Sequence, residues 1–320
     1  MLARVIAWRP TETVLRRTFL GALVMNTVIV VTGGAVRLTA SGLGCPTFPR
    51  CTDQSLVVTR EMGAHGVIEF GNRMLTFVLS AAVAAALVTA WRAGRRDLLR
   101  PALLLFLGIV VQAALGGVTV LTGLNPLTVM AHFLVSMGLI AVAVLAYERA
   151  AGNRSATARP HRALTTGAGL LSAAVATTLV LGTVVTGTGP HSGDKNASHR
   201  LPFDLEAVTQ LHADFVFLVI GLTVGLLVAA RAGDAPQPLP RRITVLLGVV
   251  LGQALVGYVQ YATDLPVALV AAHVLGACLV WIATLRVLLA SLPTRTYDAQ
   301  ELNGSAAAGS RREQVSAASR

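Results

Sequence analysis

Eight long stretches of hydrophobic residues alternate with short polar segments along the chain. Each stretch has the roughly 20 residues that an α-helix needs to cross the hydrocarbon core of a bilayer. Short turns such as "TGLNP" and "ATDLP" separate some of them. The pattern therefore predicts an all-α integral membrane fold with eight transmembrane helices, near residues 19–36, 66–90, 101–121, 128–147, 164–186, 206–230, 243–263 and 267–290.

The composition agrees with a membrane class. Hydrophobic residues make up 54% of the 320 residues and charged residues 13%, and the mean hydropathy is +0.68. These values exclude an ordinary soluble domain of this length. The net charge of +11 raises the question of nucleic-acid binding, but a basic excess in a membrane protein reflects its topology, so no nucleic-acid partner is expected.

The positions of the arginines predict the orientation in the membrane. They gather after the second, fourth and sixth hydrophobic stretches, at Arg92, Arg95, Arg96, Arg100, Arg149, Arg154, Arg159, Arg162, Arg231, Arg241 and Arg242. The segments between these clusters carry few basic residues. Because cytoplasmic loops retain basic residues, both termini are predicted to be cytoplasmic. The first hydrophobic stretch is too long for a signal-peptide core and is expected to remain as a helix.

The two halves of the chain resemble each other. "GIVVQAALGGVTVLTGLNPLTVMAHFLVSMG" aligns with "GVVLGQALVGYVQYATDLPVALVAAHVLGA", so that Gln112 matches Gln253 and His132 matches His273, each 141 residues apart. The glutamines are expected to form hydrogen bonds between helices. A repeat of four spans predicts two tandem four-helix bundles related by a pseudo-twofold axis along the membrane normal. The predicted units are residues 1–150, residues 151–292 and a disordered cytoplasmic tail at 293–320.

Four ionisable residues lie inside predicted spans, where they mark a functional site by default: Glu69, His132, His212 and His273. All three histidines are expected about 9–10 Å below the outer surface, at about 1.5 Å per helical residue. A single such histidine is more simply a core residue bonded to a neighbouring helix. Recurrence at one depth instead favours axial ligation of a haem iron, with His212 and His273 as a candidate pair.

The halves differ at the position that corresponds to His212. An offset of 140 residues leads to Asn72, and Glu69 lies three residues earlier on the same helix face. A haem with two strong ligands suits electron transfer, whereas one ligand beside a carboxylate suits a substrate that must leave. The neighbouring Arg73 either pairs with Glu69 or meets a porphyrin propionate, and the sequence leaves both open.

Five segments, in this order, resemble haem A synthase of the cytochrome oxidase assembly pathway: "TGGAVRLTASGLGCPTFPRC", "EFGNRMLT", "MAHFLVS", "QLHADFVF" and "AAHVLGA". The resemblance covers about residues 19–290. It implies an oxidoreductase that oxidises the C8 methyl group of haem O to a formyl group by successive hydroxylations, which gives haem A for terminal oxidase assembly. Haem O would be the substrate, and haem O synthase and cytochrome oxidase subunits are partners suggested by pathway logic.

The resemblance also assigns roles to residues. It implies haem B between His212 and His273, with His132 as a ligand of the substrate haem and Glu69 as the catalytic carboxylate. Many members have histidine where this chain has Asn72. A second ligand for the substrate iron could come from histidines expected in outer loops, although each is more simply a solvated loop residue: His65, His191 and His199.

In the resembling family, the pair Cys45 and Cys51 lies on the oxidising outer face, where a disulfide persists. The pair either serves the substrate site or is a structural clip, while Cys278 is expected to be an inert packing residue. The expected location is a bacterial plasma membrane, because the chain has no long Arg/Ser-rich transit segment.

Two other functions compete with this reading. A dihaem electron-transfer cytochrome explains the histidines but gives Glu69 no purpose. A transporter with repeated bundles would favour helices broken at mid-depth, which the sequence does not indicate.

Overall fold

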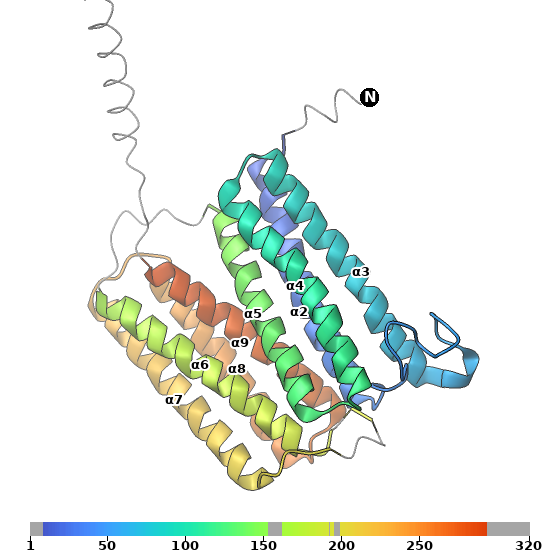
Figure 1. Cartoon of the computed structure of the whole chain (residues 1–320). Helices are drawn as coiled ribbons and strands as arrows, with labels where there is room; N and C mark the ends of the chain where they lie inside the picture. Colours follow the sequence, from blue (N-terminus) through green and yellow to red (C-terminus); the bar gives the residue numbers. More distant parts are fainter. Residues whose placement is uncertain (1–8, 153–161, 192, 195–198, 293–320) are drawn as a thin grey trace, which may run out of the picture.

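The computed structural model describes residues 9–152, 162–191, 193–194 and 199–292, which form eight long helices, one short 3₁₀ helix and no strand (Figure 1). The helices are α2 (Glu12–Leu38), η1 (Arg60–Met62), α3 (Gly63–Arg92), α4 (Arg96–Leu121), α5 (Pro126–Ala150), α6 (Arg162–Thr188), α7 (Leu205–Ala232), α8 (Leu239–Ala262) and α9 (Val267–Ser291). Each long helix is long and apolar enough to cross a membrane. The predicted all-α, multi-pass membrane fold is confirmed.

The helices extend past the hydrophobic stretches that predicted them. Helix α4 begins at Arg96 rather than near residue 101, so that it contains Pro101. Proline has no N–H to donate to the carbonyl of Asp97, four residues earlier. The Nη1 atom of Arg149 on α5 donates to that carbonyl at 3.0 Å instead. A hydrogen bond from the neighbouring helix thus satisfies the acceptor that a proline inside a helix leaves open.

The long helices pack in two groups that lie side by side (Figure 1). Helices α2 to α5 contact one another, as do α6 to α9, and the contacts between the groups come from α2, α5, α6 and α9. Phe19 and Ile140 lie in one buried cluster, and Ile243 lies in a second. The unit boundaries at 150 and 292 and the pseudo-twofold axis stay predictions, and the tail at 293–320 lies outside the described residues.

Polar contacts join the two groups. The indole Nε1 of Trp281 on α9 donates to the carbonyl of Met137 on α5 at 2.9 Å. Nearer the ends of the helices, the buried carboxylate of Glu148 on α5 is 2.5 Å from Nη2 of Arg242 and 2.7 Å from Nε of Arg286. These arginines belong to α8 and α9, so one acid of the first group holds two helices of the second.

Replacing Glu148 with Ala should lower the thermal stability of the protein in detergent. It leaves Arg242 and Arg286 without this acid, and breaking a buried ion pair from one side costs about 3 kcal/mol. Thermal unfolding, followed by tryptophan fluorescence, measures the effect. The matched control is Asp97→Ala in the more exposed pair with Arg95, for which we expect less than about 1 kcal/mol. Equal shifts for the two variants would contradict a stabilising role for the buried acid.

Candidate functional site

The loop at residues 39–59, between α2 and η1, carries the cysteine pair. Cys45 and Cys51 are joined by a disulfide bond, which confirms the prediction, and both are fully buried. The loop lies directly against the start of α3. A Cβ atom added to Gly44 would lie 2.3 Å from the carbonyl oxygen of His65. The close approach of the two backbones therefore requires glycine at this position.

Glu69 lies beneath this loop, with 7% of its side chain exposed. Its Oε2 atom accepts a hydrogen bond from the backbone amide of Cys45 at 2.6 Å. Its Oε1 atom is 2.5 Å from Nη2 of Arg73, one turn further along α3. Hydrogen bonds that involve a charged group are about twice as strong as neutral ones. The carboxylate is thus held in place by the disulfide loop and by its own helix.

Arg73 binds the backbone of the same loop. Its Nη2 atom donates to the carbonyl of Cys45 at 3.0 Å, and its Nη1 atom donates to the carbonyls of Thr47 at 3.1 Å and Arg50 at 3.2 Å. Of the two roles left open by the sequence, the structure contains the pairing with Glu69. The arginine positions both the acid and the loop that covers it.

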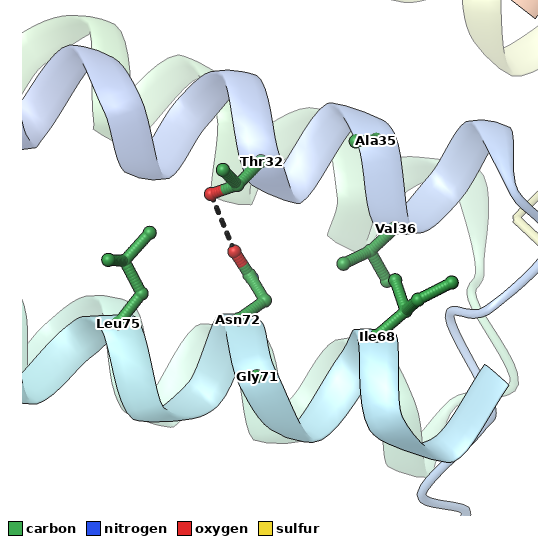
Figure 2. A pocket seen from close by; sticks show the side chains of 7 residues that line it. All are labelled: Thr32, Ala35, Val36, Ile68, Gly71, Asn72 and Leu75. Carbon is green, nitrogen blue, oxygen red and sulfur yellow. Dashed lines mark hydrogen bonds between the residues drawn. The ribbon is translucent and has the colours of Figure 1, made fainter. Parts of the chain in front are cut away.

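Asn72 lies between α2 and α3, against Thr32 (Figure 2). The Oγ1 atom of Thr32 is 2.8 Å from Oδ1 of Asn72 and 3.0 Å from the carbonyl oxygen of Val28. The Thr32 hydroxyl donates to the amide oxygen of Asn72, which fixes the orientation of that amide. The other amide atom faces Gly33. A cavity of 280 Å³ adjoins the pair, lined by Thr32, Ala35, Val36, Ile68, Gly71, Asn72 and Leu75.

The three candidate haem ligands lie at similar positions in their helices. His132, His212 and His273 follow the first residues of α5, α7 and α9 by six, seven and six residues. The ring centroids of His212 and His273 are 6.5 Å apart, with the ring planes inclined by 60°. The Nδ1 atoms of His132 and His273 are buried and have no hydrogen-bond partner within the described part of the chain. The structure therefore brings the predicted C-terminal pair together.

The repeated glutamines hold the backbone of two of these histidines. The Nε2 atom of Gln112 on α4 donates to the carbonyl of His132 at 3.0 Å, and that of Gln253 on α8 donates to the carbonyl of His273 at 2.8 Å. Gln112 also donates to the hydroxyl of Ser136. The predicted hydrogen bonds between helices are confirmed, and they take the same form in both halves.

The other histidines have different surroundings. The predicted loop position of His65 is wrong. This residue lies in the first turn of α3, because η1 leads directly into that helix before the apolar stretch begins. Its Nδ1 atom is 3.0 Å from the hydroxyl of Ser41. The Nε2 atom of His191 is 3.1 Å from the carbonyl oxygen of Leu265. His199 is exposed in a loop, as predicted.

Sequence reasoning missed Thr32 and the glycines that face the histidine rings. Threonines occur throughout the hydrophobic stretches, so no local signal distinguishes Thr32. Gly116 and Gly257 did have a signal, since they are 141 residues apart, as are the matched glutamines and histidines. The shared offset links a glycine, a glutamine and a histidine in each half.

Comparison with known proteins places this arrangement in a family. Residues 16–192, more than half of the chain, match the family described as "Cytochrome oxidase assembly protein" (COX15-CtaA). The chain belongs to this cytochrome oxidase assembly protein family. Its relatives include proteins named "Heme A synthase" from Listeria welshimeri and Listeria monocytogenes, each 32% identical over 126 residues, which are 38% of this chain and 41% of theirs. A protein of the same name from Geobacillus kaustophilus is 30% identical over 114 residues, 35% of each chain.

The family match covers some of the candidate residues and not others. The chain spans about two fifths of the length of the Listeria relatives that it matches. The matched family segment contains the cysteine loop, Glu69, Asn72 and His132, whereas His212 and His273 lie beyond residue 192. Membership of the cytochrome oxidase assembly family is thus established, and the roles of individual residues stay predictions.

Replacing Arg73 with Gln should loosen the disulfide loop. The variant loses charge-assisted hydrogen bonds to the loop carbonyls, each worth about 1.5–3 kcal/mol, so local opening becomes more frequent. We expect trypsin to cleave after Arg50 and Arg60 at least about tenfold faster in the folded protein, as measured by mass spectrometry. The exposed substitution Glu61→Gln serves as the control. An unchanged cleavage rate in Arg73→Gln would mean that the loop is held without this side chain.

Proposed function

We propose that this chain is a haem A synthase, an oxidoreductase that converts the C8 methyl group of haem O into the formyl group of haem A in a bacterial membrane. Membership of the cytochrome oxidase assembly family and the names of the bacterial relatives support this proposal. The observation that carries it is the contrast between the two groups of helices. One holds a close imidazole pair, while the other holds a histidine and a buried carboxylate beneath a disulfide loop.

The proposed cofactor is haem B, with His212 and His273 as its axial ligands. A metal–imidazole bond is about 2 Å long and a ring nitrogen lies about 1.1 Å from the ring centroid, so two imidazoles on opposite sides of one ion have centroids about 6 Å apart. The observed separation of 6.5 Å fits this arrangement. The Nδ1 atom of His273 is buried and has no hydrogen-bond partner among the described residues, so that nitrogen does not commit the imidazole to another group. When bound there, haem B would supply one-electron transfer.

The proposed substrate site lies in the other group of helices, with His132 as the ligand of the substrate iron. Glu69 is the proposed catalytic carboxylate: as electrons leave the reacting methyl group for an electron acceptor, Glu69 would accept the proton released there or stabilise the positive charge that develops. The Cys45 amide and Arg73 fix its two oxygens, so the acid is oriented before the substrate arrives. Asn72 replaces a second strong ligand with an amide, which suits a porphyrin that must be released.

The proposed topology places both termini in the cytoplasm and the cysteine loop on the outer, oxidising face. Arginines lie at the ends of α3, α5 and α7, on the side opposite this loop. Haem O synthase and cytochrome oxidase subunits are the proposed protein partners, since one would supply the substrate and the other would use the product.

The test of the proposed function is chromatography of haems extracted from a host that makes haem O, lacks haem A and expresses this chain. A peak of formyl-bearing haem A is the expected result. Co-purification of haem B with unchanged haem O, under aerobic conditions with working electron acceptors, would overturn the synthase proposal. That result would favour an electron-transfer cytochrome.

In the same host, Glu69→Gln should keep the bound haem and lose the product. Glutamine has the shape of glutamate and retains one oxygen acceptor, but it cannot take up a proton at this position. We expect haem A formation to fall at least about a hundredfold, within the range of general acid–base catalysis. Haem content should stay near that of the wild type, and Glu61→Gln on η1 is the matched control. Haem A at wild-type amounts would remove Glu69 from the catalytic role.

Replacing Asn72 with His should change the spectrum of the substrate site. A second imidazole opposite His132 would convert a weakly liganded iron into a low-spin centre with two strong ligands. Electron paramagnetic resonance of the protein loaded with haem O measures the added low-spin signal, with Asn72→Leu as the control. A spectrum equal to that of the wild type would place residue 72 away from the iron.

A further inference from the structure

In each half of the chain, a glutamine donates a hydrogen bond to the backbone of a histidine, and a glycine four residues later lies close to the ring of the same histidine. On α4, Gln112 donates to the carbonyl of His132, and a Cβ atom added to Gly116 would lie 3.4 Å from Cε1 of that histidine. On α8, Gln253 donates to the carbonyl of His273 in the same way. Residues four apart lie on one face of a helix, so each pair meets its histidine from one side.

The glycine of the second pair approaches its imidazole at least as closely. A Cβ atom on Gly257 would lie 3.3 Å from Cε1 and 3.7 Å from Nδ1 of His273. Protein interiors are packed so densely that even one added methyl group is felt. Alanine at this position would therefore push the imidazole edge sideways by some tenths of an ångström.

Within the described residues, no hydrogen bond to Nδ1 holds the orientation of the rings of His132 and His273. Histidines that bind a metal usually donate the second ring N–H to a carbonyl or carboxylate, which fixes the ring. Here the Nδ1 atoms of both histidines are buried without such a partner among the residues that the structure describes. The neighbours on α4 and α8 are a glutamine bonded to the backbone carbonyl of each histidine and a glycine close to the edge of its ring.

The same glycine contact recurs on α6 and α2, without the glutamine. A Cβ atom on Gly182 would lie 3.2 Å from Cε1 of His212, and one on Gly33 would lie 3.9 Å from Nδ2 of Asn72. Thr178 and Ile29 occupy the positions four residues earlier. A glycine of the preceding helix thus lies near each of the four candidate residues, Asn72, His132, His212 and His273. The two on α5 and α9 also accept a hydrogen bond from glutamine.

We infer that the pairs Gln112–Gly116 and Gln253–Gly257 are positioning residues, which orient His132 and His273 for axial ligation of haem iron. This inference rests on the proposed function. The glutamine sets the height of the histidine relative to the neighbouring helix, and the glycine sets the rotation of the imidazole. A ring moved off the iron axis weakens its bond to the metal without removing the ligand.

The first test uses the purified full-length protein with its bound haem. In Gly257→Ala, we expect part of the low-spin haem B signal in absorption and electron paramagnetic resonance spectra to become high-spin. Haem affinity should fall by about tenfold, as is typical when a group that orients a metal ligand is lost. Gly252→Ala on the same helix is the matched control, since nothing lies within 4 Å of the added atom. Alanine also favours helix more than glycine does, so the change does not weaken α8 itself.

Further variants separate the two halves and guard against misfolding. Gly116→Ala should leave the haem B spectrum unchanged and alter the spectrum of added haem O, with Gly138→Ala as its control. Gln253→Leu removes the anchor of His273 without filling the glycine position, and it should also raise the high-spin fraction. It decides the question if Gly257→Ala does not fold.

The possible failures are distinguishable. A wild-type protein that shows low-spin haem B, together with unchanged spectra and affinity in Gly257→Ala and Gln253→Leu, would overturn the positioning role alone. A wild-type protein without low-spin haem B would overturn the proposed haem site, and the positioning role with it.

Discussion

The hydrocarbon core of a bilayer offers no water to polar groups, and this constraint governs where such groups lie in this protein. The backbone is satisfied by forming helices. A buried acid is expensive unless it is paired. Glu148 lies between two arginines of other helices, and Glu69 lies between Arg73 and the amide of Cys45. Each acid therefore joins segments that are distant in sequence. The contacts that neutralise the buried carboxylates also hold these segments together.

The pairing of Glu69 links the extramembrane loop to the membrane site. The disulfide gives the loop a fixed shape, and Arg73 binds three of its carbonyls together with the acid. The loop is thus part of the structure that orients the proposed catalytic carboxylate. A structural role for the cysteine pair and a role near the substrate site are therefore compatible, because the backbone of Cys45 contacts Glu69 directly.

The two halves of the chain are more alike in the residues around the proposed haem ligands than in the ligands themselves. A glycine of the preceding helix lies close to His132, His212 and His273, and Gly33 lies near Asn72 in the same way. A change of one side chain in a retained setting is enough to turn a site with two imidazoles into a site with one. This divergence is consistent with the proposed functions, in which one half would retain haem B and the other would release its product.

The membrane class, the eight helices, the repeat and the candidate residues could all be predicted from the amino-acid sequence. These follow from hydropathy, residue spacing and motifs, which are local properties of the chain. The sequence also supported the disulfide and the interhelical role of Gln112 and Gln253. The three-dimensional arrangement of the helices was needed to show that Arg73 pairs with Glu69, that Thr32 bonds to Asn72, and that α3 begins before His65. The spacing of residues within one helix does not show which residue of a neighbouring helix or loop lies opposite a given side chain. That arrangement determines the hydrogen-bond partner of each polar group.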